Sequence, residues 1–237
     1  MALPMQKTPW YTTKIPSTEQ TVKFRPFLVK EQKALLLAQQ SEDQLTMIDT
    51  LKSVLLDCLQ DKVDVDSLAT FDLEYLFSQI RAKSVGEIVE LILRCDTCED
   101  EKAKVKVSVN LTDLKVEKPE GHTKNITLFE DVGVVMKYPK IDVLQKIESL
   151  QEGDIESVFN LMTDSIDIIY AGEELHHARE YSKKELTDFL ENLTEDQFKK
   201  IQNFFETMPR LEKKLDYKCP MCQKDQSVLV QGIDSFF

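Results

Sequence analysis

Two Cys-x-x-Cys pairs, far apart in the sequence, constrain this chain more than any other feature. The first pair is Cys95 and Cys98, the second is Cys219 and Cys222, and residues 99–218 separate them. Four cysteines in two such pairs match the tetrahedral shell of a structural zinc site. Each pair supplies two thiolates from one tight turn, so the shell is complete only if the intervening chain folds back. We therefore predict a zinc-ribbon-like Cys₄ unit formed by two sequence-distant knuckles.

The binding energy of such a centre exceeds the entropy cost of closing the loop. Closing a loop of about 120 residues costs about 4–5 kcal/mol, whereas finger-type sites bind zinc with about 10–16 kcal/mol. The residues beyond each knuckle predict strands at 105–109 and 227–230, and we expect the metal to stabilise the pairing of these strands. Four cysteine ligands leave no position for water, so the expected zinc is structural and not catalytic.

A redox role for one pair is the main alternative to metal binding. A thioredoxin-like motif opens a helix, because the helix N-terminus lowers the pKa of the thiol. Here each pair precedes a predicted strand, and three acidic residues at 99–101 follow Cys98. Metal binding is therefore favoured. The fifth cysteine, Cys58, lies on the apolar face of a predicted helix and is expected to be a small buried side chain.

Size and charge set broad limits on function. With 237 residues the chain can form one sizeable domain or two small ones. Its net charge of −12 opposes nucleic-acid binding, which depends on neutralising phosphates, and is compatible with protein partners. The N-terminal residues are too polar for a signal peptide, and no segment has the roughly 20 apolar residues of a membrane span. Paired cysteines without a secretion signal point to a reducing cytosol.

Hydrophobic periodicity predicts both helices and strands. Residues 1–30 read as an extended arm with a strand at 21–29, and 141–214 read as mainly helical. Further strands are expected at 87–94, 105–109, 125–128, 132–138 and 227–230, and 166–170 is either a helix end or a short strand. Helices are expected at 30–40, 66–84, 141–150 and 155–164. Three more helices are expected to begin at capping boxes, which are Ser41 with Gln44, Ser182 with Glu185, and Thr194 with Gln197. The last of these helices is expected to end at Pro209.

These elements predict an α+β fold that is mainly helical, with short antiparallel strands. After the arm at 1–30, residues 31–237 are expected to form a single unit. Within it, 85–112 and 215–237 form the zinc-ribbon-like part, and 113–214 form a mostly helical insertion.

No catalytic motif accompanies the cysteines. His176-His177 follows two glutamates but lacks the i, i+4 histidine pair of a metalloprotease helix, and no phosphate-binding or serine-nucleophile motif occurs. We therefore predict that the protein is not an enzyme. Aromatic residues near both ends are either buried in the core or available as protein contacts, because aromatics are enriched in interface hot spots. They are Trp10, Tyr11, Phe27, Phe236 and Phe237.

Specific segments are spread along nearly the whole chain. In order they are Ile15-Pro16-Ser17, Phe24-Arg25-Pro26-Phe27, an acidic helix with Cys58, Asp72-Leu73-Glu74-Tyr75-Leu76-Phe77, Ile80-Arg81-Ala82-Lys83-Ser84, the first knuckle, Phe189-Leu190-Glu191-Asn192-Leu193-Thr194, Phe198, Phe204-Phe205, Pro209, the knuckle Cys219-Pro220-Met221-Cys222 and the closing Phe-Phe. In this order they resemble a family of baseplate hub proteins from T-even-like phages with contractile tails. One departure is Gln223, which stands where a glycine is frequent after such a knuckle.

The resemblance implies a non-enzymatic structural or assembly component of a phage baseplate hub, with other hub and tail proteins as partners. It implies a place in the tail baseplate of the virion after assembly in the host cytoplasm. The family includes a small hub subunit and a factor for hub assembly, so an assembly factor absent from the mature virion is an alternative. A zinc-ribbon regulator associated with nucleic acid is a second alternative, which the net charge opposes.

Overall fold

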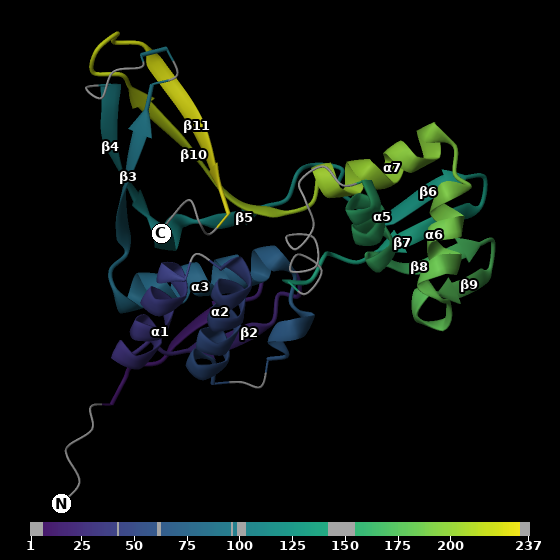
Figure 1. Ribbon diagram of the computed structural model, residues 1–237, viewed down its shortest axis with the longest axis horizontal. Helices are drawn as coiled ribbons and strands as arrows, with labels where there is room; N and C mark the ends of the chain where they lie inside the picture. Colours follow the sequence, from purple (N-terminus) through teal and green to yellow (C-terminus); the bar gives the residue numbers. More distant parts are fainter. Residues whose placement is uncertain are drawn as a thin grey trace, which may run out of the picture. The chain divides into compact units, whose positions relative to one another are not determined.

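A computed structural model of the chain describes residues 7–41, 43–60, 63–95, 97–98, 103–141 and 155–232 (Figure 1). The backbone divides into two compact units. The first comprises Met1–Val65, Phe71–Glu117 and Arg210–Phe237, and the second comprises Asp66–Thr70 and Lys118–Pro209. Helices and antiparallel strands occur in both units. The α+β class is therefore confirmed, whereas a mainly helical content is not.

The N-terminal part of the first unit contains a β-hairpin. β1 (Tyr11–Lys14) pairs antiparallel with β2 (Thr21–Phe24). Val22 and Phe24 are buried because alternate residues of a strand face the same side. Phe24 also forms an isolated bridge with Leu59. The segment expected to be an extended arm at 1–30 therefore carries a hairpin that contributes to the core of the first unit.

Three α-helices complete the N-terminal half of the first unit. They are α1 (Val29–Gln40), α2 (Gln44–Cys58) and α3 (Thr70–Ser84). A short 3₁₀ helix, η1 (Val65–Ser67), precedes α3 and, apart from Val65, belongs to the second unit. The predicted capping box at Ser41 is wrong, because Ser41 ends α1 and its Oγ donates to Ala38 O at 2.7 Å. The N-cap of α2 is Asp43, whose carboxylate accepts from Thr46 N at 3.1 Å. Cys58 is buried, as predicted.

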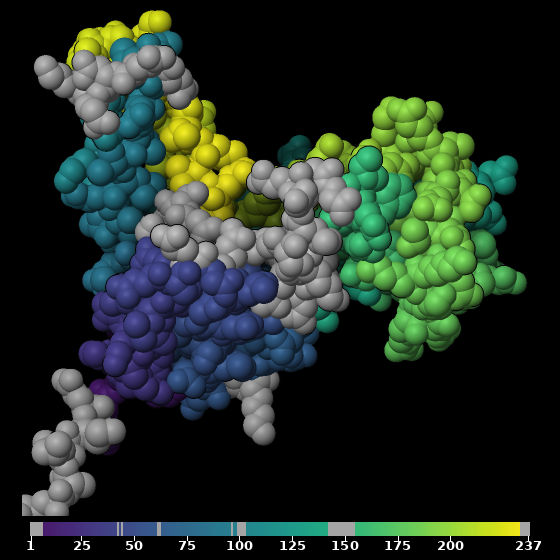
Figure 2. Space-filling view, in the orientation of Figure 1, coloured from purple at the N-terminus to yellow at the C-terminus, as the bar shows by residue number. Residues whose placement is uncertain are grey.

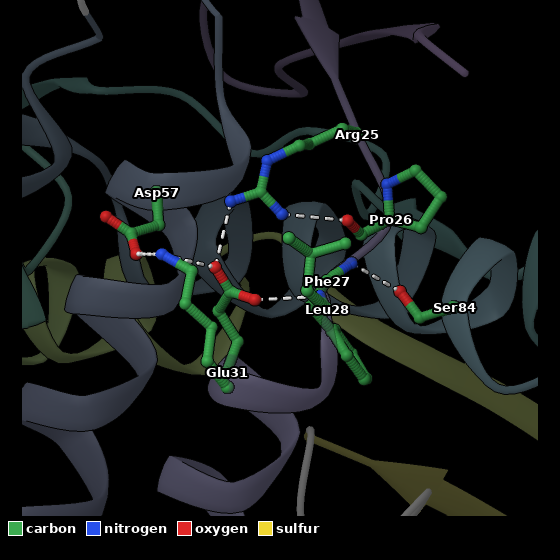
Figure 3. A network of polar contacts seen from close by, with 8 residues as sticks. Arg25, Pro26, Phe27, Leu28, Glu31, Asp57 and Ser84 are labelled. Atoms are coloured by element: carbon green, nitrogen blue, oxygen red, sulfur yellow. Dashed lines mark hydrogen bonds and ion pairs between the residues drawn. The ribbon is translucent and has the colours of Figure 1, made fainter. Parts of the chain in front are cut away.

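A buried ion pair fixes the start of α1 (Figure 3). Arg25 Nη2 donates to Glu31 Oε1 at 2.8 Å, and the second carboxylate oxygen of Glu31 accepts from Leu28 N at 2.7 Å. Phe27 N donates to Ser84 Oγ at 2.9 Å, which joins this segment to α3. Burial alone would raise the pKa of Glu31, but the hydrogen bonds from Arg25, Leu28 and Lys30 lower it to about 2.

The remaining strands of the first unit form two separate sheets. β3 (Ile88–Arg94) pairs with β4 (Lys104–Asn110), which leads through η3 (Leu111–Asp113) to the next sheet. That sheet has the order β11-β10-β5. Its strands are β5 (Lys115–Glu117), β10 (Arg210–Lys218) and β11 (Asp225–Gln231).

The predicted pairing of the strands at 105–109 and 227–230 is therefore wrong. Each of these strands pairs with its own neighbour across a knuckle, because an antiparallel hairpin satisfies its backbone hydrogen bonds locally. The two hairpins meet through side chains instead. Val109, Leu215 and Val230 are buried in one apolar cluster that includes residues of both hairpins. In Figure 1 the hairpins lie beside each other, β3–β4 in teal and β10–β11 in yellow.

The second unit packs helices on a four-stranded antiparallel sheet of order β6-β7-β8-β9. Ile126, Val134, Leu190 and Phe204 are among its buried core residues. The strands are β6 (Asn125–Phe129), β7 (Val132–Met136), β8 (Ile166–Ala171) and β9 (Glu174–His177). The helices are α5 (Ile155–Asp164), η4 (Ala178–Glu180), α6 (Lys183–Glu191) and α7 (Glu195–Glu206).

The second unit contains both predicted and unpredicted elements. The strands expected at 125–128 and 132–138 and the capping boxes of Ser182 and Thr194 are confirmed. The segment 166–170 is a strand, and with β9 it forms a hairpin inside the stretch 141–214 that was expected to be mainly helical. The helix expected at 141–150 lies outside the described residues, apart from Ile141. No helix in the described part of the chain is long and apolar enough to cross a membrane.

The ion pair at the start of α1 makes a testable contribution to stability. Because the pKa of Glu31 in the folded protein lies below its ordinary value of 4.5, its carboxylate stabilises the fold above that pH. This contribution is lost as the pH falls from 4.5 towards about 2. We expect Glu31→Gln to lower the free energy of unfolding by about 3 kcal/mol at pH 7, and by less at pH 3. Urea unfolding at the two pH values measures the difference.

Glu90→Gln is the matched control, since Glu90 pairs with Lys106 at 3.1 Å on an exposed surface. An exposed pair contributes less than about 1 kcal/mol. Equal losses in the two variants at pH 7 would contradict the role assigned to Glu31.

Candidate metal centre

The four paired cysteines lie at the tips of the two hairpins. Cys95 directly follows β3, and Cys219 follows β10. The second knuckle is closed by two backbone hydrogen bonds, from Cys219 N to Lys224 O and from Gln223 N to Cys219 O, both at 3.0 Å. Each Cys-x-x-Cys pair therefore lies between the two antiparallel strands of one hairpin, whereas the sequence predicted a preceding strand only for the first pair.

The distances between the sulfur atoms suit a tetrahedral ion. The Sγ atoms of Cys95, Cys98, Cys219 and Cys222 all lie within 4.8 Å of one another. Those of Cys95 and Cys222, which belong to different knuckles, are 3.8 Å apart. A regular tetrahedron with Zn–S bonds of about 2.3 Å has sulfur–sulfur edges of about 3.8 Å. The spacing therefore fits a single four-coordinate metal ion.

The surroundings of the sulfurs favour a bound cation. Cys95 and Cys219 are buried, and Cys98 and Cys222 are partly buried. Hydrogen bonds from the side chain and backbone of Thr97 lower the pKa of the Cys95 thiol to about 6. The hydrogen bond with Cys222, together with burial, raises the pKa of Cys98 to about 12. A pKa of about 12 disfavours the thiolate of Cys98 at neutral pH, and a divalent metal ion at the centre of the cluster would stabilise that thiolate.

Contacts below the cluster hold the two hairpins together. The hydroxyl of Tyr217 in β10 donates to Arg94 O at the end of β3, at 2.7 Å. The apolar cluster that joins the hairpins includes Val107 of β4 and Val228 of β11, both partly buried. In the space-filling view the residues of the two hairpins, in teal and yellow, lie next to each other on the visible face (Figure 2). Packing between the hairpins therefore brings the cysteine pairs together.

Two residues of this region were not identified from the sequence. Thr97 lies inside the first Cys-x-x-Cys pair, and its Oγ1 is 3.2 Å from the Sγ of Cys95. Tyr217 lies two residues before the second pair. Position inside or next to a knuckle is the only sequence signal for either residue, and it does not specify a hydrogen bond.

The departure at Gln223 has a structural consequence. Gln223 adopts a left-handed backbone conformation, with φ of 58°. Glycine adopts this conformation without the steric cost that a Cβ atom incurs. The Gln223 side chain donates from Nε2 to Pro220 O at 2.9 Å, which offsets part of that cost. The second knuckle thus keeps the turn that a glycine would allow.

The histidines take no part in this cluster. His176 lies on β9, where its Nδ1 is 2.7 Å from the hydroxyl of Tyr181. His122 is buried in the second unit between the Thr207 and Tyr138 hydroxyls, at 3.0 and 3.1 Å. Burial, with Lys118 and Lys124 nearby, lowers its pKa and favours the neutral ring. These contacts give both histidines structural roles.

The predicted contact residues differ in exposure. Trp10 is 48% exposed, and Tyr11 and Phe27 are partly buried. Phe236 and Phe237 lie outside the described residues.

Comparison with known proteins gives two consistent matches. A family model described as "T4 bacteriophage base plate protein" matches residues 8–237. The chain is also 24% identical over 214 residues to "Baseplate hub assembly protein gp26" of Enterobacteria phage T4, which covers 90% of each chain. No solved structure matches. The family match extends over the two knuckles and over both compact units.

The backbone of the second knuckle gives a prediction that requires no metal measurement. We expect Gln223→Val to lower the thermal midpoint by about 3–6 °C, because a β-branched side chain is more strained than Gln at positive φ and because the hydrogen bond to Pro220 O is lost, at a cost of about 1–2 kcal/mol in all. Gln223→Gly is expected to keep the midpoint within about 2 °C of the parent. Calorimetry measures both variants. Ser227→Val on the extended strand β11 is the control, and an equal loss there would contradict the role of backbone conformation.

Proposed function

The chain belongs to the T4 bacteriophage base plate protein family, and from that premise we propose that it is a non-enzymatic component or assembly factor of a phage baseplate hub. The observation that carries this proposal is the extent of the similarity, which spans residues 8–237 and 90% of the T4 relative. A match of that length covers the whole architecture and not one shared motif. The partners we propose are other baseplate hub and tail proteins, and not nucleic acid.

The name of the T4 relative, a hub assembly protein, supports a role in building the hub. We place the chain at the tail baseplate, either as a subunit that stays there or as a factor that acts in the host cytoplasm during assembly. In both cases it acts by binding proteins. The acidic net charge of −12 is compatible with protein contacts and opposes binding to phosphate backbones.

The metal in this proposal is a structural zinc bound by Cys95, Cys98, Cys219 and Cys222. The support is the sulfur geometry, with one inter-knuckle distance of 3.8 Å, and the choice of four soft thiolate ligands. Four protein ligands fill a tetrahedral shell, so no position remains for a substrate or a reactive water. The ion would hold the tips of the two hairpins together and so preserve a binding surface.

Zinc content tests the metal assignment. We expect the purified chain to contain one zinc ion per molecule by elemental analysis, and cobalt substitution to give the absorption of a tetrahedral thiolate complex. Cys219→Ser should lose the ion and lower the thermal midpoint by more than about 10 °C, because finger-type zinc binding is worth about 10–16 kcal/mol.

Cys58→Ala is the matched control, since Cys58 is buried away from the cluster in α2. It should keep the zinc. A parent protein that contains no zinc, or a Cys219→Ser variant that retains it, would rule out this centre.

Copurification tests the role in the hub. We expect the tagged chain, co-expressed with the baseplate proteins of its phage, to retain at least one hub protein through size-exclusion chromatography. Mass spectrometry of purified virions then separates the two forms of the proposal. Presence in the virion identifies a subunit, and absence together with failed hub assembly in a deletion phage identifies an assembly factor. Normal hubs in the deletion phage would refute both.

A further inference from the structure

The four-stranded sheet of the second unit presents different side chains on its two faces (Figure 1). Ile126 and Val134 are register partners on the face that belongs to the buried core. Because successive residues of a strand point to opposite faces, Val135, Ile168 and Tyr170 point to the other one. None of these three belongs to the core cluster among the described residues of this unit. They lie on the outer face of the sheet.

The outer face is apolar where a solvated sheet face normally carries polar side chains. Val135 pairs with Ile168 between β7 and β8, and Tyr170 pairs with Leu175 between β8 and β9. Leu175 is 60% exposed, and the other three residues are partly buried. Antiparallel sheets with one face in solvent usually place apolar residues inward and polar residues outward. A contiguous apolar group on the outward side therefore indicates a contact surface.

The side chain of Tyr170 covers the middle of the outer face. Gly133 is its register partner on β7, and a Cβ atom at Gly133 would overlap the Tyr170 ring. The Tyr170 hydroxyl lies 3.2 Å from Thr127 Oγ1 on β6. The side chain thus extends from β8 across β7 to β6 and is held at its far end. An aromatic ring fixed in this way offers a surface for aliphatic side chains and for the cations of Lys and Arg.

Acidic turns border one end of the sheet. Glu130 and Asp131 connect β6 to β7, and Glu173 lies in the turn that connects β8 to β9. Gly172 N donates to Asp131 O at 3.0 Å, which places the two turns side by side. All three acidic residues are exposed. The apolar outer face therefore has a negatively charged border.

The second unit also carries most of the net negative charge of the chain. Residues 118–209 contain 19 Asp and Glu against 10 Lys and Arg, so they carry −9 of the total of −12. Such a charge attracts a positively charged partner surface. It opposes contact with nucleic acid. It also opposes a two-fold interface with a second copy, since that interface would bring the same acidic unit against itself.

We propose that the outer face binds a hub protein through an apolar patch bordered by Lys or Arg. Apolar side chains of the partner pack on Val135, Ile168 and Leu175, and its cations contact the Tyr170 ring and the acidic turns. The inference rests on the function proposed above, because it takes the partner to be a protein of the baseplate hub. It adds the binding surface on this chain and the chemistry of the surface that fits it.

An exposed leucine on the outer face provides the first test. We expect Leu175→Gln to raise the Kd for the copurified hub protein about tenfold or more, because binding buries this apolar side chain. Calorimetric titration measures the change. Leu56→Gln is the matched control, since Leu56 on α2 of the first unit is 56% exposed. It should keep the Kd within about twofold, and both variants should keep the thermal midpoint of the parent, as exposed substitutions usually do.

The acidic turns provide a second test, through charge. Glu130 has φ of 43°, so Glu130→Gly removes a carboxylate without a steric cost to the turn. We expect Glu130→Gly and Glu173→Gln each to raise the Kd about two- to fivefold, the range for exposed charge pairs. The Kd of the parent should rise with NaCl between about 50 and 300 mM, and that of the double variant should rise less.

Glu195→Gln is the matched control for charge. Glu195 is an exposed residue of α7 in the same unit and pairs with Lys199 at 2.7 Å. The change removes one negative charge from the unit but none from the turns beside the outer face. It should leave the Kd within about twofold and keep the salt dependence of the parent. Equal effects of Glu195→Gln and Glu173→Gln would overturn the role of the acidic turns.

Photocrosslinking identifies the partner segment. With benzoylphenylalanine in place of Leu175, we expect a crosslink to the hub protein at a peptide that carries Lys or Arg beside apolar residues. The same probe in place of Leu56 should give no such crosslink. A crosslink from position 175 to a second copy of this chain, or to an acidic peptide, would overturn the proposal.

The outcomes separate this inference from the proposed function. A hub protein that binds the parent, Leu175→Gln and the double turn variant equally well would overturn the outer face as the binding surface and leave the role in the hub intact. A parent chain that retains no hub protein would refute the proposed function and, with it, this inference.

Discussion

The contact between two antiparallel hairpins is the interaction on which the first unit depends. Each hairpin satisfies its own backbone hydrogen bonds, so nothing in the ladders themselves brings β4 close to β10. Apolar packing that includes Val109, Leu215 and Val230 does so, together with the hydrogen bond from Tyr217 to Arg94 O. Once the hairpins are packed, their tips place four sulfurs at metal-binding distance. A bound ion would then reinforce an arrangement that side-chain packing already specifies.

Many of the helices and strands can be predicted from the sequence, because the patterns that predict them involve residues close together in the chain. The capping boxes at Ser182 and Thr194 are confirmed, since such a box needs only residues three positions apart. The box at Ser41 fails because Asp43 takes the N-cap position instead. β10 was not predicted, because lysines and acids interrupt its alternation of buried residues. The pairing of β4 with β11 was wrong, since alternation shows which face of a strand is buried and not which strand lies next to it.

The candidate metal ligands could be predicted from the sequence, but the residues that position them could not. Spacing identified Cys95, Cys98, Cys219 and Cys222, and the structure brings their sulfurs together. Spacing cannot identify Thr97 or Tyr217, because their contacts depend on how the two turns face each other. It also cannot show that Gln223 adopts the conformation usually taken by glycine, since only the folded turn imposes that φ. Residue types therefore indicate the ligands, whereas the groups that position them require tertiary structure.

The chain path explains how a metal centre can be local although its ligands are remote in sequence. β5 ends at Glu117 and β10 begins at Arg210, and these two residues are partners in the same sheet. The chain therefore leaves the first unit and returns to it at adjacent positions, and 118–209 fold around their own core. A second connection runs through 66–70, where Ala69 bridges Lys140. Because the ends of the insertion are already paired in the sheet, a metal ion bound by the four cysteines would close only a short structural gap despite the length of the intervening sequence. Strand pairing offsets much of the loop-closure entropy, so the binding energy of such an ion would be available to stabilise the hairpins.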